Sequence, residues 1–597
     1  MSHLPSHHTT GTSTSSSSRP KTRDLSDSER VLWQRAGQIW LDELFLRDPF
    51  MIETSEEEAA YYAQESLASI NALTFETNLN LKHMRSLHVD EFLFTFMAHE
   101  IGHHAVAPAG LTNQMRYLAA ARQVSMDKNK LPGYVNIALD LLINTILVTQ
   151  HNLPCPEIYK RICKNQPIES FSFGLMLGAM ERLWNCEPMF VGFTQSFEKY
   201  NVFSEALCAI YELHGEGRRG ADLIPYVTLA CRLLANADSE HPSPQNSQPQ
   251  SLDNLVAATP EDADELRKWL RSGGMMSMDN AAEQAKRILA KQSKASLTGS
   301  KSPTFPDYSP RLASDMINGT AAGMIISPTE IIINYYESMA NAHLVSFTAD
   351  RGGHSELYPE SLKEWSLGDP IEEIDWLQSS IRSGHPIPGV NTVAWEYGSD
   401  PEPLGAEPFP IDLDIYVDTS GSMPDPHRSM SHIALGAFIF ALSVLRQGGA
   451  VRVTIWSYDE RNLLSTNTFS TSKETVLSTL CHSIRGGTQF PVKHWETALN
   501  SHQDRSNVVH TVILSDDGID TWFQNPRIYP LEQVTSILAR VQNEFKGGGT
   551  VILNGNASSV GYNLPEDWSV FGCRTWQDVV NACADVATRK FTQKINS

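Results

Sequence analysis

The sequence predicts a multi-domain protein in which a mainly α-helical N-terminal part is followed by a doubly wound α/β domain. Three observations support this prediction. A chain of 597 residues is too long to fold around one hydrophobic core. Apolar residues recur at helical spacing from Leu32 to about Asn236. From Ile411 onward, short apolar runs alternate with amphipathic runs, which is typical of a parallel sheet covered by helices on both faces.

Composition divides the chain into five parts. Residues 1–28 are rich in Ser, Thr, His and Pro, and they should form a disordered arm because they offer almost no apolar surface to bury. Residues 29–236 should form the helical domain. Residues 237–327 begin with a polar, proline-containing stretch and are expected to be a linker with one charged helix. A mixed connecting region is expected over 328–410, and the α/β domain over 411–597.

Charge and cysteine usage limit the partners and the location. A net charge of −22 argues against binding to a nucleic-acid backbone, whereas a locally basic protein remains compatible. Eight cysteines without a Cys-x-x-Cys pair, in a chain of this size, predict free thiols and a reducing cytoplasm. The longest apolar run, residues 433–445, is too short to cross a membrane, and the first residues lack the layout of a secretory signal.

The α/β part can be divided into individual elements. Strands are predicted at 413–417, 451–457, 508–514, 550–554 and 569–572, and helices at about 429–446, 472–484, 490–500, 531–544 and 576–590. Ligands in such sheets bind beyond the carboxyl ends of the strands. The glycines at 486–487 and 547–549 are not followed by the Gly-Lys-Ser/Thr of a phosphate-binding loop, so we do not expect the chain to be an ATPase.

The first strand of this part runs directly into a set of oxygen donors. Asp418, Ser420 and Ser422 place short oxygen-bearing side chains at every second position. A hard cation such as Mg²⁺ prefers oxygen ligands in octahedral geometry and keeps some of its waters. Thr488 follows a two-glycine loop and Asp516 follows another apolar strand, so both are candidates to complete the site. The competing interpretation is a strand-end turn that merely caps a helix.

These segments, in this order, resemble the von Willebrand factor A domain and its metal-ion-dependent adhesion site. The resemblance covers residues 411–597. It implies a first element formed by Asp418, Ser420 and Ser422, a second formed by Thr488 and a third formed by Asp516. The neighbouring Asp517 leaves the register of the third element open by one residue. In that family the ion keeps one position open for a carboxylate of a protein partner, so the site serves recognition and performs no bond chemistry.

A second candidate metal site, of the HExxH type, lies far upstream. The stretch His99-Glu100-Ile101-Gly102-His103 should lie on a buried helix that starts near Asp90 and ends before Pro108. Histidines four residues apart face the same way on a helix, and Zn²⁺ binds imidazole nitrogens and acidifies a bound water. Glu100 is offset by one residue and would be the general base. The competing interpretation is that both histidines are ordinary helix residues near the surface.

A zinc site needs a third ligand, and the next long apolar segment offers one. Asp140 and Asn144 are four residues apart on an otherwise apolar helical stretch over 135–145. A lone carboxylate on such a face is costly unless it is paired or coordinated. We therefore expect Asp140 to be the third ligand and Asn144 to support the site. His104 lies outside the pattern.

The two helical segments resemble zincin peptidases, and more closely a metallopeptidase domain found in bacterial proteins that also carry a von Willebrand A domain. Asn136, Ala138, Asp140 and Asn144 match its Asn-x-Ala-x-Asp-x-x-x-Asn helix. The resemblance implies Zn²⁺ held by His99, His103 and Asp140. It also implies a protein partner, because chains that combine the two domains accompany MoxR-type AAA+ ATPases in bacteria.

Two functions follow from these features. The first is a zinc-dependent metallopeptidase whose C-terminal domain recruits a protein partner or client through Mg²⁺. The second is a non-catalytic adaptor for a MoxR-type AAA+ ATPase, in which the zinc site is structural or vestigial. Neither involves nucleic acid or a membrane. The two hypotheses share the protein partner and differ over the role of Glu100.

Overall fold

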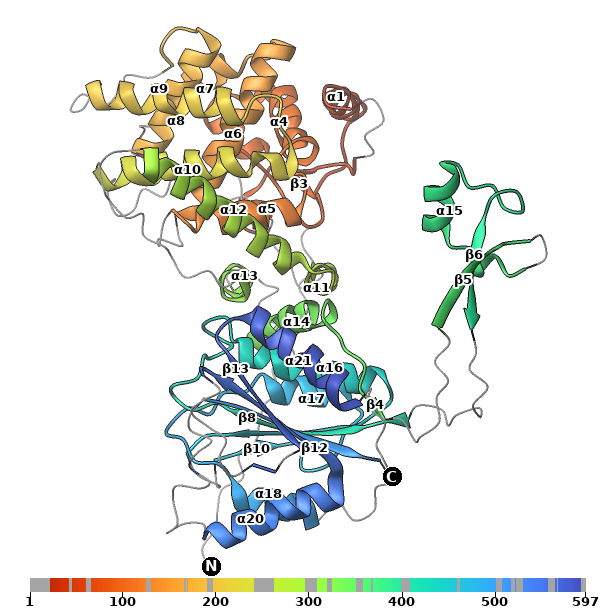
Figure 1. Cartoon of the computed structure of the whole chain (residues 1–597). Coiled ribbons are helices and arrows are strands. Elements are labelled where there is room, and N and C mark those ends of the chain that lie inside the picture. Colours follow the sequence, from red (N-terminus) through yellow and green to blue (C-terminus); the bar gives the residue numbers. More distant parts are fainter. Residues whose placement is uncertain are drawn as a thin grey trace, which may run out of the picture. The chain divides into compact units, whose positions relative to one another are not determined.

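The computed structural model describes residues 22–41, 46–60, 66–124, 130–165, 168, 170–189, 197–240, 262–295, 309–318, 325–349, 358–366, 369–398, 409–458, 462–500, 507–516, 521, 530–556, 564–565 and 567–591. The chain divides into two compact units, Met1–Ser338 and Met339–Ser597. The first is mainly helical and the second contains a six-stranded sheet (Figure 1). The predicted combination of helical and α/β parts is therefore confirmed.

The first unit is built around the long helix α6. Its helices are α1 (Asp27–Gln38), α2 (Ser55–Ala60), α3 (Leu81–Ser86), α4 (Leu93–Ala105), α5 (Leu111–Ala121), α6 (Leu131–His151), α7 (Cys155–Asn165), α8 (Phe171–Trp184), α9 (Phe197–His214), α10 (Ile224–Glu240), α11 (Ala263–Arg271), α12 (Gly274–Ala295), α13 (Ser309–Asn318) and α14 (Pro328–Asn341). Helix α6 packs against α4, α5, α8 and α10. It is long and apolar enough to cross a membrane, but 83% of the relevant window is buried inside the protein, as in a core helix.

The first unit also contains a small sheet that the sequence did not reveal. Its strands are β1 (Phe50–Ile52), β2 (Ala68–Ile70) and β3 (Thr77–Asn80), in the order β1-β3-β2. Strand β3 pairs parallel with β1 and antiparallel with β2. Strands β2 and β3 contact α4. Strand β2 is an edge strand, and its position beside α4 brings it next to the candidate histidine site.

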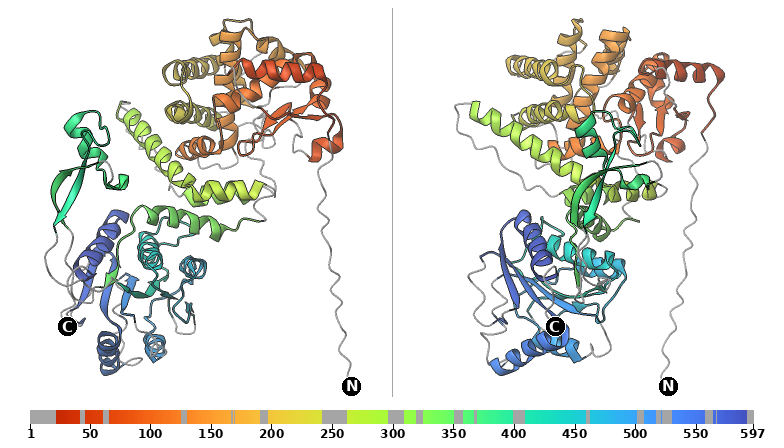
Figure 2. Two further views of the ribbon diagram at one scale, coloured as in Figure 1. Left: turned by 90° about the vertical axis from the view of Figure 1, so that its right-hand side faces the viewer. Right: turned by 45° about the vertical axis from the view of Figure 1, so that its right-hand side comes forward.

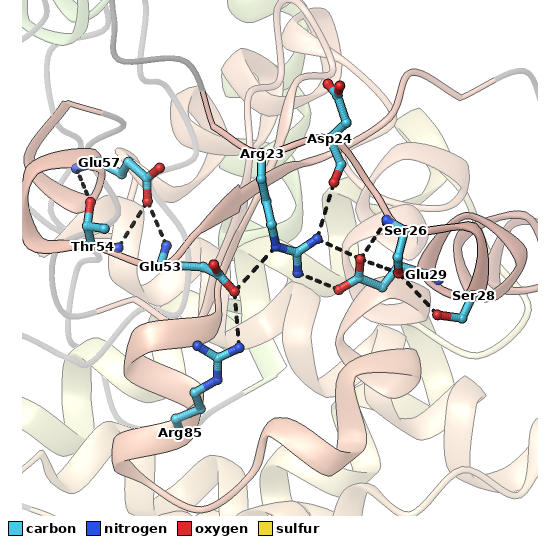
Figure 3. A network of polar contacts seen from close by, with 9 residues as sticks. All are labelled: Arg23, Asp24, Ser26, Ser28, Glu29, Glu53, Thr54, Glu57 and Arg85. Atoms are coloured by element: carbon cyan, nitrogen blue, oxygen red, sulfur yellow. Dashed lines mark hydrogen bonds and ion pairs between the residues drawn. The ribbon is translucent and has the colours of Figure 1, made fainter.

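Residues 22–28, which we predicted to belong to a disordered arm, have a defined structure. Residues 1–21 lie outside the described part of the chain, but 22–28 are ordered and α1 begins at Asp27. Figure 3 shows the reason: Arg23 forms a two-armed ion pair with Glu29, and its Nε lies 3.4 Å from Glu53. The hydrogen bonds from Arg23 lower the pKa of Glu29 to about 2. Ser26 and Glu29 form a capping box at the start of α1. These polar contacts, one of them with the distant Glu53, order a segment that has little apolar content.

The predicted linker over 237–327 is largely part of the first unit. Residues 241–261 lie outside the described ranges, whereas α10 continues to Glu240. Helices α11, α12 and α13 follow, and α12 packs along α5. The packing uses a stripe of buried small and sulfur-containing side chains: Met275, Met278, Ala281, Ala282 and Ala285. The expected charged helix is thus present, but its apolar stripe covers α5.

The second unit is a doubly wound sheet. Its strands are β8 (Asp412–Asp418), β9 (Val451–Trp456), β10 (Leu464–Ser465), β11 (Val509–Ser515), β12 (Lys546–Asn554) and β13 (Trp568–Cys573), in the order β10-β9-β8-β11-β12-β13. All pairs are parallel except β10 with β9. The five predicted strands are confirmed to within a few residues, and the short edge strand β10 was missed.

Helices cover both faces of this sheet (Figures 1 and 2). One face carries α16 (His432–Arg446), α17 (Lys473–Leu480) and α21 (Trp576–Phe591), and the other carries α18 (Val492–Asn500) and α20 (Leu531–Arg540). The predicted helices are confirmed. The α18–α20 face has an aromatic core that includes Tyr416, Trp456, Phe490, Trp495 and Trp568.

A buried ion pair fastens neighbouring strands of the sheet. Arg452 on β9 donates from Nε and Nη2 to the two carboxylate oxygens of Asp414 on β8, at 2.8 and 2.6 Å. Its Nη1 donates to the carbonyl of Ala498 on α18. Both side chains are essentially excluded from solvent. The bidentate geometry supplies the carboxylate with fixed positive partners, which is what a buried charge requires.

The connecting region contains a small module with its own fold. Strands β5 (Tyr358–Glu364) and β6 (Val393–Gly398) form a hairpin, and α15 (Trp376–Ser383) lies in the connection between them. Its core consists of Trp365, Ile374 and Ala394. Strands β4 (Thr348–Ala349) and β7 (Phe409–Pro410) pair where the chain leaves and rejoins the rest of the second unit.

Candidate metal centres

Helices α4 and α6 bring together three side chains that could hold a metal ion. His99 and His103 lie one turn apart on α4, and Asp140 faces them from α6. Their exposed fractions are 5%, 1% and 2%, respectively. Gly102 permits this approach, because a Cβ atom there would lie 2.7 Å from both Ile143 of α6 and the Trp40 ring.

The three donor atoms form a triangle of the size that a tetrahedral ion requires. His99 Nε2 lies 3.2 Å from His103 Nε2. Asp140 Oδ1 lies 3.5 Å from the first nitrogen and 3.3 Å from the second. Ligands at about 2.0–2.1 Å from a tetrahedral centre are separated by roughly 3.3–3.4 Å. This group could hold a metal ion, and its three side chains are those named from the sequence.

Hydrogen bonds fix which nitrogen of each imidazole carries the proton. His103 Nδ1 lies 3.0 Å from the carbonyl oxygen of Ala107, which can only accept, so this nitrogen donates. His99 Nδ1 lies 3.0 Å from Asn144 Oδ1, while the Nδ2 of Asn144 donates to the hydroxyl of Tyr159. Asn144 thus orients its oxygen toward His99. Both Nε2 atoms are left with lone pairs that face each other, as is usual for imidazoles that bind a metal.

Asp140 adds a third lone pair to the same point. Its Oδ2 accepts a hydrogen bond of 3.2 Å from Asn136, whereas its Oδ1 accepts none from the described residues. Burial raises the pKa of Asp140, whereas hydrogen bonds from His103 and His99, when these imidazoles are protonated at Nε2, lower it, and the net pKa lies below its usual value. A proton shared between His99 Nε2 and His103 Nε2 would leave Asp140 Oδ1 without a partner. A cation bound by all three atoms would interact with each of their lone pairs.

A pocket opens beside this group. It is lined by His99 and Glu100 of α4, Leu67 and Ala68 next to and on β2, and Ile158 of α7, among others. Glu100 lines the pocket and is 1% exposed, so its side chain is buried beside His99. An apolar wall beside a carboxylate and a group of side chains that could hold a metal ion is suited to a chemical step that requires exclusion of bulk water.

His104 has a different environment from its two neighbours on α4. Its ring lies 4.2 Å from that of Phe75 in an edge-on contact. Burial lowers its pKa. It is not among the three side chains that converge.

The second candidate site lies where the strand order of the sheet reverses. From β8 the chain continues to β9 on one side, while β11 lies on the other. Asp418 ends β8, and Ser515 ends β11 just before Asp516. Crevices outside the carboxyl ends of strands at such a reversal bind ligands in many α/β proteins.

Hydrogen bonds join the predicted oxygen donors into one cluster. Asp418 Oδ1 accepts from the backbone N–H of Ser420 at 2.8 Å, and Oδ2 accepts from the hydroxyl of Ser515 at 2.6 Å. The hydroxyls of Ser420 and Ser422 lie 3.2 Å apart, and Ser422 donates to Asp516. The structure therefore brings together four of the five predicted donors. Asp517 lies outside the described residues, so the register of the third element is undecided.

The loop that precedes Thr488 is hydrogen-bonded to the segment that carries Ser420. The N–H of Gly421 donates to the carbonyl of Gly486 at 2.9 Å, and the N–H of Arg485 donates to the carbonyl of Thr419 at 3.1 Å. Gly486 has φ +128°, which favours glycine. Arg485 also donates to Asp425 at 2.8 Å. Ser515, Asp425 and Arg485 were missed from the sequence; only the position of Ser515 beside Asp516 gave a signal.

The electrostatics of Asp418 differ from those of Asp140. Burial and, to a smaller extent, the charge of Asp516 raise the pKa of Asp418 to about 6, against the hydrogen bonds from Ser515 and Ser420. No basic side chain among the described residues forms an ion pair with Asp418, so repulsion between the two carboxylates would be relieved by a cation.

Comparison with known proteins adds no identity. No protein-family model matches the sequence, and no curated protein matches it. The functional conclusion therefore depends on the geometry of the two sites.

Proposed function

We propose that this protein is a zinc-dependent metallopeptidase whose C-terminal unit recruits a protein partner through a Mg²⁺ site. The observation that carries the first half is the convergence of three buried lone pairs from His99, His103 and Asp140. Two imidazoles and a carboxylate are the ligand set of catalytic zinc sites, which keep one position for substrate or water. Zinc held there would polarise a peptide carbonyl and promote ionisation of water.

The protein's own groups supply the remaining chemistry. Glu100 lines the pocket beside His99 and is the general base that takes a proton from the attacking water. Asn144 and the Ala107 carbonyl hold the two imidazoles in the correct tautomer. The pocket wall from Leu67, Phe96 and Ile158 excludes bulk water from the cleaved bond.

The C-terminal unit supports the recruitment half of the proposal. Asp418, Ser420, Ser422 and Asp516 present oxygen atoms only, which suits Mg²⁺. We assign Thr488 to the same site because its loop is hydrogen-bonded to residues 419–421. The resemblance to the von Willebrand A domain supports a partner that supplies a carboxylate. We also propose a reducing, cytoplasmic location, since all eight cysteines are free thiols.

A non-catalytic adaptor for a MoxR-type AAA+ ATPase is the second candidate, and one observation favours it. The three metal-binding side chains and Glu100 are each at most 5% exposed. Structural zinc sites are closed, whereas catalytic sites need access for substrate. In this version the His99 group stabilises the helical unit, and the Mg²⁺ site carries the function.

Replacement of Glu100 distinguishes the two candidates. Glu100→Gln should keep zinc at wild-type content and lower hydrolysis of an unfolded protein substrate by about 10²–10⁴-fold. The matched control is Glu91→Gln, because Glu91 is a surface residue just before α4. Activity that survives Glu100→Gln contradicts the peptidase. Zinc retention by a wild-type chain that shows no hydrolysis supports the adaptor.

A further inference from the structure

The connection between β5 and β6 carries a concentration of exposed apolar side chains. Six large apolar residues in it are each at least 47% exposed: Ile371, Trp376, Leu377, Ile381, Ile387 and Val390. Elsewhere in the described ranges, exposed apolar residues are scattered, as Val202 and Leu213 are on α9. Single exposed residues are normal, whereas a concentration marks an interaction site. We refer to these six side chains as the 371–390 surface.

Polar contacts fix α15 so that it presents its apolar residues outward. Ser379 is the buried residue of this helix, and its hydroxyl accepts a hydrogen bond of 2.9 Å from the N–H of Val393. Asp375 caps the helix and accepts a second hydrogen bond from Trp395 Nε1. Leu377 and Ile381 are one turn apart, so they form an outward stripe. The face of α15 that carries Ser379 is therefore bonded to β6, and the apolar stripe lies on the opposite face.

The turn after α15 is also held in place. Asn391 accepts from the N–H of Ile387 at 2.6 Å and donates to the carbonyl of His385 at 3.0 Å. The N–H of Val390 donates to the carbonyl of Ile387. A preformed turn loses little conformational entropy when a partner binds. The surface is thus ready to bind without refolding. Figures 1 and 2 show the hairpin with α15 beside its closed end.

The charge around the surface limits the kind of partner. The described module carries seven acidic residues and two basic ones, and Glu372 and Glu373 are both exposed next to Ile371. The whole chain has a net charge of −22. Like charges disfavour a second copy of this chain, and an anionic membrane surface is disfavoured for the same reason.

We propose that the 371–390 surface binds a protein that presents an apolar patch flanked by Lys or Arg. The surface contains no residue of either candidate ion site, so this proposal does not depend on metal binding or peptidase activity. Apolar burial supplies the affinity, and the acidic rim of Glu372 and Glu373 selects the basic partner.

A crosslinking experiment on the full-length chain tests this. A photo-crosslinking amino acid replaces Leu377 in the cells that produce the protein, and a control chain carries it at Leu213, which has a similar exposure of 66% against 68%. The expected product is one crosslinked protein, specific to position 377, whose contact peptide is apolar and contains Lys or Arg. The synthetic form of that peptide should bind the purified chain, with an affinity that falls as salt is added.

Two variants make the result decisive. L377S/I381S should weaken peptide binding at least tenfold, whereas the matched pair V202S/L213S should leave it unchanged. E372K/E373K, which leaves the apolar side chains intact, should weaken it several-fold. The proposal is overturned if the crosslink forms within the chain, to a second copy or to lipid, if none forms, or if the contact peptide is acidic. Binding that is insensitive to L377S/I381S overturns it as well.

Discussion

The two candidate ion sites both bring several metal-ligand atoms together, but one is buried between helices and the other lies at the edge of a sheet. His99, His103 and Asp140 project from the sides of two packed helices into the interior, where water cannot satisfy their lone pairs. Asp418 and Asp516 stand at the ends of parallel strands, and Ser422 beside them is exposed. The first site should hold its ion as part of the fold. The second should exchange its ion and leave room for a partner.

The second unit contains a control for this difference. Asp414 is as buried as Asp140, but Arg452 satisfies both of its oxygens. A buried carboxylate with a guanidinium partner needs no ion. Among the residues that the structure describes, the ion-pair partners of Asp140 Oδ1 are the imidazoles of His99 and His103, and hydrogen bonds at their Nδ1 atoms orient these rings. The comparison leads to four predictions, given from the largest expected effect to the smallest.

Removal of metal should destabilise the first unit much more than the second, and this is the largest difference that we expect between them. At zinc concentrations near a thousand times the dissociation constant, binding stabilises the folded state by about 4 kcal/mol. A chelator should therefore accelerate amide exchange in α4 and α6, while β8 and β11 change little, and added zinc should restore protection. Exchange in α4 and α6 that is the same with and without chelator would contradict the buried site.

The stability of the second unit should fall as pH rises, because the pKa of Asp418 is raised in the folded state. Its pKa is raised to about 6 in the folded state. The stability contributed by the protonated form is fully present below about pH 4 and is lost as pH rises through about 6. The loss amounts to about 3 kcal/mol. Urea unfolding between pH 4 and pH 7 measures it.

Mg²⁺ should remove that pH dependence, because it stabilises the ionised carboxylate. Asp412→Asn is the matched control: Asp412 is buried at the other end of β8, and its replacement should leave the response of stability to Mg²⁺ unchanged. Stability that rises between pH 4 and pH 6 in the absence of Mg²⁺, measured as the contribution lost in Asp418→Asn, would be incompatible with this account.

Loss of the hydrogen bond that orients the His99 imidazole should have a smaller effect, on zinc affinity. Asn144→Ala removes the acceptor for His99 Nδ1 and should weaken zinc binding by about 10–100-fold. Thr145→Ala is the control: this neighbouring hydroxyl is also buried, but it bonds to the carbonyl of Leu141. Competition with a zinc chelator of known affinity gives both values. Equal losses in the two variants would show that helix packing, and not imidazole orientation, determines binding.

The smallest effect concerns the glycine loop at the sheet edge. Arg485→Ala removes the contact that ties this loop to Asp425 and should lower Mg²⁺ affinity a few-fold, equivalent to at most about 1 kcal/mol. Arg428→Ala tests the ion pair alone, because Arg428 also approaches Asp425 but lies outside the loop. Calorimetric titration with Mg²⁺ compares them. A larger loss in Arg428→Ala would reverse the assignment.

Local spacing made both sites predictable. Residues four apart on a helix share a face, so His99 with His103 and Asp140 with Asn144 could be paired from the sequence. Strand ends in a parallel sheet share an edge, so Asp418 and Asp516 could be expected together. The strands themselves were found because β8, β9 and β11 are continuous apolar runs.

Features that depend on distant pairing were missed. Strands β1, β2 and β3 have three or four residues each and acquire their conformation from one another, so no periodicity marks them. The ordered segment before α1 depends on Arg23 meeting Glu53 across the fold. From the sequence, helix α12 was predicted to be a charged helix in a linker. Its buried Met and Ala stripe became apparent only in the structure, where α12 packs against α5.

Zinc content of the purified full-length chain tests the central claim most directly. Elemental analysis compares the wild type with His103→Ala and with His104→Ala, which changes the next histidine on the same helix. The buried group predicts one zinc per chain in the wild type and in His104→Ala, and none in His103→Ala. A wild-type chain without zinc after equilibration with the ion, or a His103→Ala chain that keeps it, would contradict the account.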